Sequence, residues 1–173
     1  VKVRGLRRDG SRWVVETDSG SISAGAVVLA TNAYTDDLWA ELRRSFSIIH
    51  YFQVATVPLG DRANEILRES QGVWDTAPIM SSLRRDAFGR LIVGSMGRLV
   101  GGHGGLSARW AKRMLGRRFP QLGRVAFETS WHGQIAMTPD HLPRIHRLSD
   151  RVYTPNGYNG RAIAAGTVIG KAM

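Results

Sequence analysis

Residues 152–173, VYTPNGYNGRAIAAGTVIGKAM, predict a short strand, a glycine turn and an apolar helix in direct succession. The strand covers 152–154, the turn covers 157–161, and the helix begins at Ala162. A helix that starts directly after glycines exposes unpaired backbone N–H groups and the positive end of its dipole. The pattern therefore predicts that an anionic or electron-rich ligand contacts this turn.

A second segment has the character of a parallel sheet. Residues 26–30, AVVLA, form a short apolar run between Gly25 and Thr31, which is typical of a strand buried on both faces. We therefore expect residues 1–34 and 151–173 to meet in space as two parts of one sheet. A domain whose sheet is left and later re-entered gives this pattern.

The middle of the chain predicts mainly antiparallel sheet. Strand-like segments lie at 46–57, 79–85, 90–95, 124–129 and 131–137, and a separate hairpin lies at 12–17 and 21–23. Helices are predicted at 36–44 and 61–70, and after the glycine-rich loop 97–105. The last of these is expected to be capped by Ser107, with Leu106, Trp110, Met114 and Leu115 on its apolar face. The predicted fold class is α+β with an antiparallel or mixed sheet and flanking helices.

Composition limits the chemistry. The 173 residues include no cysteine, which excludes disulfides, thiolate metal sites and a cysteine nucleophile, so any redox chemistry belongs to a bound cofactor. Hydrophobic residues make up 43% of the chain, as in globular proteins. No apolar run approaches the roughly 20 residues of a membrane span, and residues 1–5 lack the apolar core of a signal peptide, so the expected location is cytoplasmic with no membrane partner.

The net charge of +10 suggests nucleic acid as a partner, but the basic residues are scattered pairs and 21 of the 24 are arginines. Two readings outside enzymology stay open here. One is a stand-alone basic module that binds nucleic acid or an acidic partner, although the scattered basic residues argue against nucleic acid. The other is a small antiparallel interaction domain without a ligand.

Several motifs carry no chemistry by themselves. The loop 101–105, GGHGG, fits neither nucleotide-binding template, and a flexible connection is the simpler reading. The five histidines lack a metal-binding spacing, so no metal is predicted, and no G-x-S-x-G motif is present. No catalytic residue is assigned. Residues 131–143, WHGQIAMTPDHLP, are unusually dense in distinctive residues, although Thr138 to Asp140 can be read as a simple turn.

Four segments taken in order resemble one family, the FAD-dependent amine and amino-acid oxidoreductases that include D-amino-acid oxidase, glycine oxidase, sarcosine oxidase and gamma-glutamylputrescine oxidoreductase. The segments are AVVLATNAY at 26–34, FPQL at 119–122, WHGQIAMTPDHLPRI at 131–145 and NGYNGRAIAAGTVIGKAM at 156–173. The resemblance implies two truncated pieces of an α/β FAD-binding domain, 1–34 and 146–173, around a substrate-binding domain, 35–145. It also implies oxidation of a small-molecule amine or amino acid by hydride transfer to the flavin.

The resemblance assigns roles to individual residues. It places the turn and the start of the last helix beside the flavin, with Trp131 and Tyr158 toward the substrate. The residues expected at the cofactor are Thr31, Asn32, Gly157, Tyr158, Asn159, Gly160 and Arg161.

Two departures from the family pattern narrow the expectation. Sarcosine-oxidase-type members carry a lysine for the substrate carboxylate where this chain has Ala164, so the match leans toward the gamma-glutamylputrescine oxidoreductase type. The sarcosine-oxidase-type members also attach FAD through a cysteine where this chain has Gly133. FAD is therefore expected to be non-covalent at that position.

The dinucleotide fingerprint G-x-G-x-x-G is not found in residues 1–25. The expectation is therefore a C-terminal part of the oxidoreductase whose partner is an N-terminal FAD-binding half. Alone, such a part is expected to bind FAD weakly or not at all and to be inactive.

Overall fold

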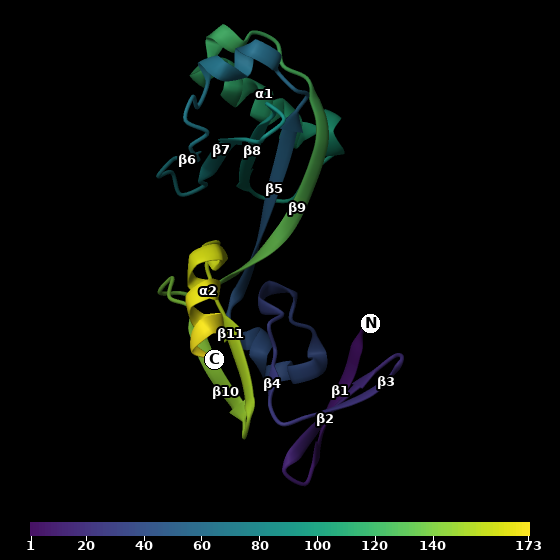
Figure 1. Ribbon diagram of the computed structural model, residues 1–173. Coiled ribbons are helices and arrows are strands. Elements are labelled where there is room, and N and C mark those ends of the chain that lie inside the picture. The colour runs from purple at the N-terminus through teal and green to yellow at the C-terminus, as the bar shows by residue number, and fades with distance from the viewer. The chain divides into compact units, whose positions relative to one another are not determined.

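The computed structural model describes residues 1–173, which form two compact units (Figure 1). The first unit contains residues 1–49 and 134–173, and the second contains residues 50–133. The divisions fall inside two long strands, β5 (Ser47–Thr56) and β9 (Phe127–Met137). The predicted boundaries at 34/35 and 145/146 differ from these divisions, since residues 35–49 and 134–145 pack with the first unit. None of the helices combines the length and apolar character needed to cross a membrane.

The first unit contains two small sheets. One has the antiparallel order β1-β2-β3, which confirms the hairpin predicted at 12–23 and adds an unpredicted first strand. The other has the order β10-β11-β4. The elements of the unit are β1 (Val3–Asp9), β2 (Arg12–Thr17), β3 (Gly20–Ala24), β4 (Val27–Val28), η1 (Asn32–Tyr34), η2 (Asp37–Ser45), β10 (Arg144–Ser149), β11 (Val152–Asn156) and α2 (Ala162–Ala172).

The parallel pairing of β4 with β11 joins segments about 125 residues apart in the chain. The Val27 N–H donates to the Arg151 carbonyl over 2.9 Å, and the Leu29 N–H donates to the Tyr153 carbonyl over 2.8 Å. The prediction that residues 1–34 and 151–173 meet in one sheet is confirmed for β4 and β11, whereas β1, β2 and β3 form a separate sheet. The expected burial of this strand on both faces is wrong, because β4 is a two-residue edge strand and Val28 is 49% exposed.

β10 was not predicted. Its sequence, RIHRLS, lacks the run of β-branched and aromatic residues that predicts a strand, because three of the six side chains are arginine or histidine. The strand nevertheless pairs antiparallel with β11, with Arg144 opposite Asn156 and His146 opposite Thr154. β11 is thus held on both sides and its end is fixed in position.

The second unit is built on a five-stranded sheet of order β6-β7-β8-β5-β9. The predicted hairpin at 79–95 is confirmed as β7 and β8, whereas the strands predicted at 124–129 and 131–137 are one continuous strand, β9. The core packs Val54, Leu91, Val93 and Leu115 together, each at most 1% exposed. The remaining elements are η3 (Gly60–Glu65), β6 (Val73–Trp74), β7 (Ser81–Arg85), β8 (Leu91–Met96), η4 (Gly102–Gly104), α1 (Leu106–Arg118) and η5 (Pro120–Leu122).

α1 presents only part of its predicted face to the core: Leu115 is buried and Met114 packs against the core, as predicted. Ala108, Ala111 and Leu115 are buried, while Leu106 is 60% exposed. Small side chains let the helix backbone lie close to the sheet, so the alanines determine the buried face. The expected cap at Ser107 is also wrong, because the helix begins at Leu106 and its N-cap residue is Gly105. The Ser107 hydroxyl instead accepts the Val100 N–H over 3.2 Å, which connects the glycine loop to the helix.

The other two predicted helices are short 3₁₀ segments. η2 is N-capped by Asp36, whose carboxylate accepts the Leu38 N–H over 3.1 Å, and it is kinked at Trp39. The helix predicted at 61–70 reaches only Glu65, because the backbone turns extended at Ile66 and places that side chain in the core at 2% exposure.

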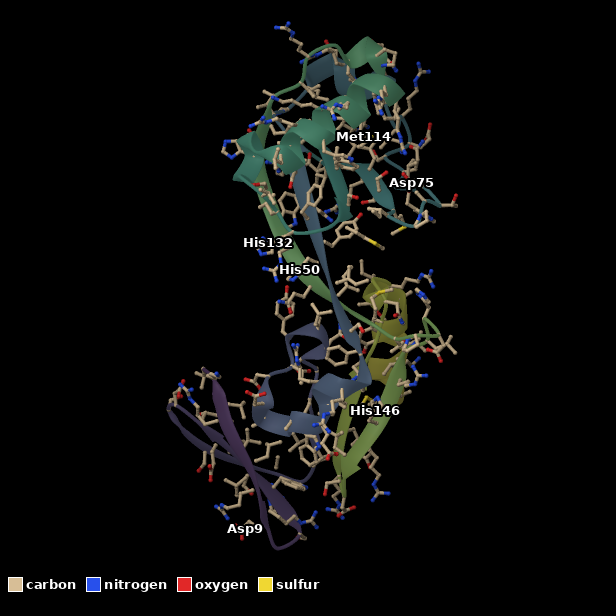
Figure 2. All side chains as sticks on the ribbon, turned by 180° about the vertical axis from the view of Figure 1, so that it is seen from behind. Asp9, His50, Asp75, Met114, His132 and His146 are labelled. Atoms are coloured by element: carbon tan, nitrogen blue, oxygen red, sulfur yellow. The ribbon has the colours of Figure 1, made fainter.

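Asp75, labelled in Figure 2, directly follows β6 and links the edge of the sheet to α1. Its carboxylate accepts the Ser81 hydroxyl, the Ser81 N–H at 3.1 Å, the Ala77 N–H at 3.3 Å and the Arg118 guanidinium at 2.7 Å. The hydrogen bonds from Ser81, and then the bond from Arg118, hold the pKa of Asp75 far below its ordinary value of 3.8.

This lowered pKa predicts a pH-dependent contribution to stability. The ionised carboxylate is favoured by the folded state, so its contribution is complete above the unfolded pKa of about 4 and is lost as the pH falls toward the folded pKa. Asp75→Asn should therefore be less stable than the wild type at pH 7, and the difference should shrink below about pH 4. Urea midpoints measured from pH 7 to pH 2 test this, with the exposed Asp61→Asn as control. A difference that does not vary with pH would contradict the assignment.

Candidate functional site

The candidate site is the turn Gly157 to Arg161, which joins the end of β11 to α2. The parallel register of β4 and β11 brings Asn32 to this turn, where its Oδ1 accepts the Gly157 N–H over 3.1 Å. Asn32 holds a positive φ of 45° at the start of η1, a conformation that asparagine tolerates better than most residues. The structure thus unites two segments that the sequence assigned to one site.

Gly157 can only be glycine. Its φ is 70°, and an added Cβ would clash with Cγ2 of Thr138. The residue is buried, so the neighbouring segment has little room to move aside. Gly160 also has a positive φ, 80°, but it is exposed.

Asn159 fastens the turn to Thr138. The Thr138 N–H donates to Asn159 Oδ1 over 2.8 Å, and Asn159 Nδ2 donates to Thr138 Oγ1 at 3.1 Å and to the Gly157 carbonyl. The Asn159 N–H donates to the Ala136 carbonyl over 3.2 Å. Since these bonds occupy both ends of the side-chain amide, Asn159 acts as a positioning residue for the turn.

Thr138 belongs to this site although sequence reasoning left it as part of a simple turn. The residue is 3% exposed, and its hydroxyl donates to the Leu142 carbonyl over 3.0 Å. It therefore closes the 138–142 turn and anchors Asn159 at the same time. The available sequence signal was a threonine before Pro139 together with a distant Asn-Gly pair, which does not reveal the contact.

The N-terminus of α2 is open. Arg161 is the N-cap residue and provides no side-chain cap, and the first turn holds no acidic residue. The Arg161 N–H donates back to the Tyr158 carbonyl over 2.9 Å, which closes the turn. The next backbone N–H groups keep the positive end of the dipole available to a ligand. Ile163, in this first turn, is 92% exposed.

Tyr158 lies between the turn and the helix. Its ring lies about 4 Å from the position that a Cβ on Gly166 would take, so it packs against the glycine of the second helical turn. Burial raises the pKa of Tyr158, so the phenol is neutral at physiological pH and its hydroxyl can donate a hydrogen bond.

The other predicted residues lie elsewhere. Thr31 is exposed and its hydroxyl pairs with that of Thr35 over 2.7 Å, so it supports the loop after β4. Trp131 lies on β9 in the second unit and is 39% exposed, so the turn described here does not include it. Ala164 is exposed near the start of α2. No group of three or more histidine, aspartate or glutamate side chains is placed to hold a metal ion.

Comparison with known proteins gives a consistent result. The family profile described as "FAD dependent oxidoreductase" matches residues 1–173. The probable oxidoreductase OrdL of Haemophilus influenzae is 30% identical over 92% of this chain and 38% of its own length. The gamma-glutamylputrescine oxidoreductase of Escherichia coli is 27% identical over 92% of this chain and 38% of its own length. The chain spans only 38–40% of the length of these curated relatives.

Solved structures show the same fold. L-proline dehydrogenase from P. horikoshii superposes with a TM-score of 0.67 at 24% identity, over 93% of this chain and 45% of that one. Glycine oxidase from Geobacillus kaustophilus gives a TM-score of 0.65 at 22% identity, over 91% and 42%. The predicted resemblance and the α+β fold class are confirmed, and nothing supports the reading as a basic binding module. The chain belongs to the family of FAD-dependent oxidoreductases.

Proposed function

We propose that this chain forms the substrate-binding and flavin-facing part of an enzyme that oxidises an amine or an amino acid with FAD. The observation that carries the proposal is the turn Gly157 to Arg161, fixed by Asn32 and Thr138 and followed by an uncapped helix. The family match over the whole chain supports it. The share of the relatives that the chain spans supports a role as one part of a longer enzyme.

The residues of the turn fit FAD. Glycine at positions 157 and 160 lets the backbone approach a flat ring closely, and the open helix N-terminus provides N–H donors and positive potential. When bound, FAD supplies the hydride acceptor for the carbon that bears the amine. The N-terminus of α2 stabilises negative charge on the ligand because its dipole is fixed in advance. Asn32 and Asn159 hold the turn in place, and the neutral Tyr158 hydroxyl donates to the flavin or to the substrate.

The two compact units take the two roles. In this enzyme the first unit binds FAD, and the second unit, with Trp131, binds the substrate. This keeps the interrupted arrangement expected for 1–34, 35–145 and 146–173 and moves the boundaries to 49/50 and 133/134. The product of the reaction is an imine, which water hydrolyses, and the electrons pass on to oxygen or another acceptor.

The preferred substrate is an amine without a carboxylate beside the nitrogen. Ala164 provides no cation for such a carboxylate, and among the relatives one is named for the oxidation of gamma-glutamylputrescine. Gly133 has no sulfur for a covalent link, so FAD is held non-covalently there. Acid precipitation of the full-length protein should release all of its flavin into the supernatant.

The decisive experiment uses the full-length protein. We expect it to purify yellow, and we expect anaerobic addition of gamma-glutamylputrescine or putrescine to bleach the flavin absorbance faster than addition of sarcosine or glycine. Ammonia or an aldehyde should appear on admission of oxygen. A protein that stays colourless after addition of FAD would remove the proposal. Bleaching by sarcosine alone would retain the flavin assignment and reject the substrate class.

A further inference from the structure

A solvent-open hollow of about 400 Å³ lies in the second unit, beside the turn that joins β7 to β8. One wall consists of Pro58, Gly60, Ala63, Asn64 and Ser70, and the other consists of residues 85–89. The hollow lies entirely within the second unit, whereas the turn Gly157 to Arg161 belongs to the first. Its volume is in the range of small-molecule sites, which begins at about 300 Å³.

The half-buried guanidinium of Arg85 is the main charged group of this hollow. It donates from Nη1 to the Ala63 carbonyl at 2.8 Å and to Asn64 Oδ1 at 3.4 Å, and from Nη2 to Ser70 Oγ at 3.2 Å. All three acceptors are neutral, and none of the ion pairs in this unit includes Arg85. The hydrogen bonds fix the guanidinium in direction, but its positive charge has no partner, and two of its five N–H groups remain free.

The carboxylate in the wall does not neutralise this charge. Asp86 accepts the Phe88 N–H at 2.9 Å, the Arg90 N–H at 3.0 Å and Arg90 Nε at 2.6 Å. Arg90 is thus the counter-charge of Asp86 and also pairs with Glu128 at 3.1 Å. Its guanidinium lies 5.2 Å from the ring centre of the exposed Phe88. Asp86 is therefore paired with Arg90 and not with Arg85, and an apolar ring lies at the edge of this wall.

The orientation of the neighbouring side chains completes a set of donors. Asn64 uses its carbonyl oxygen toward Arg85, so its amide hydrogens are free to donate. Ser70 accepts from Arg85 with its oxygen, so its hydroxyl hydrogen is also free. We propose that the hollow is a binding site for a small oxyanion, the phosphate or carboxylate group of a small molecule, held by Arg85, Asn64 and Ser70. A planar guanidinium with adjacent neutral donors matches the oxygens of either group.

Calorimetric titration of the full-length protein with inorganic phosphate and with acetate tests the site, with chloride at equal ionic strength as reference. We expect Asn64→Asp to weaken binding by about tenfold or more, because one carboxylate oxygen still accepts from Arg85 while the other repels the anion. The matched control is Arg84→Gln on the same strand, which changes the net charge equally and removes only an exposed bond to Gln53. This control should bind like the wild type.

Arg85→Lys provides a second variant if Asn64→Asp folds poorly, since it keeps the charge and loses the planar fork. It should weaken binding severalfold with little change in melting temperature. Binding of only one of the two anions would identify the group that the site selects. Equal weakening in Asn64→Asp and Arg84→Gln, or no preference over chloride, would overturn the proposal.

Discussion

Gly157→Ala should lower the free energy of unfolding by about 2–5 kcal/mol. A Cβ at a φ of 70° costs about 1–2 kcal/mol, because the left-handed conformation brings it against the backbone. The same Cβ clashes with Cγ2 of Thr138, and inserting a methyl group into a packed site costs typically about 1–3 kcal/mol. Urea unfolding followed by circular dichroism gives the difference directly.

Two further variants separate these contributions. Thr138→Ser removes Cγ2 and keeps the hydroxyl, so in the Gly157→Ala background it should recover the part of the loss that comes from the clash. Gly170→Ala is the control, because an added Cβ meets nothing within 4 Å in α2, and it should be neutral or stabilising by up to about 1 kcal/mol. A Gly157→Ala variant as stable as the wild type would show that the turn is not rigid.

Asn159→Ala should have the second-largest effect, a loss of about 2–4 kcal/mol. The change leaves the N–H of the buried Thr138 without its acceptor and places alanine at a φ of 54°. If the proposed function is correct, the released turn also weakens FAD binding by about tenfold or more. Unfolding midpoints and the flavin content of the purified full-length protein measure the two effects separately.

Asn159→Gly serves as the comparison. It removes the same hydrogen bonds but accepts the positive φ without strain, so it should be more stable than Asn159→Ala by about 1 kcal/mol. Both variants should lose flavin alike if the side-chain bonds position the turn. Full flavin content in both variants would contradict the role of Asn159 in positioning the turn. The stability prediction would be unaffected, because the unfolding midpoints test it separately.

The sequence predicted those parts of the site that depend on local pattern. The apolar run before Thr31 and the glycine turn before Ala162 each have a short-range signature, and their meeting follows from the rules of parallel sheets. The structure adds Thr138, which is 21 residues from Asn159 and is joined to it only by side-chain hydrogen bonds. Such a contact leaves no periodic trace in the sequence.

The errors in the predicted fold also come from tertiary packing, which the local sequence pattern does not record. α1 buries Ala108 and Ala111 beside the predicted Leu115 and leaves the predicted Leu106 exposed, because close packing on a sheet favours small side chains. The predicted helix does not continue beyond Glu65, because the backbone is extended at Ile66 and the Ile66 side chain is buried in the core. Arg85 could not be singled out among the 21 arginines of the sequence, since the hollow that it lines and the three neutral acceptors that hold it appear only in the structure.

The hydrogen bond from Gly157 to Asn32 also has a consequence for synthesis of the protein on the ribosome. Its two residues are 125 positions apart, so β4 emerges long before β11 exists to pair with it. The closing of so long a loop is entropically costly and precedes the gain from the contacts, which makes this pairing a late event in folding. The second unit, whose residues 50–133 lie between the two strands, can fold in the meantime. We therefore expect the nascent chain to form the turn Gly157 to Arg161 only after that unit is complete.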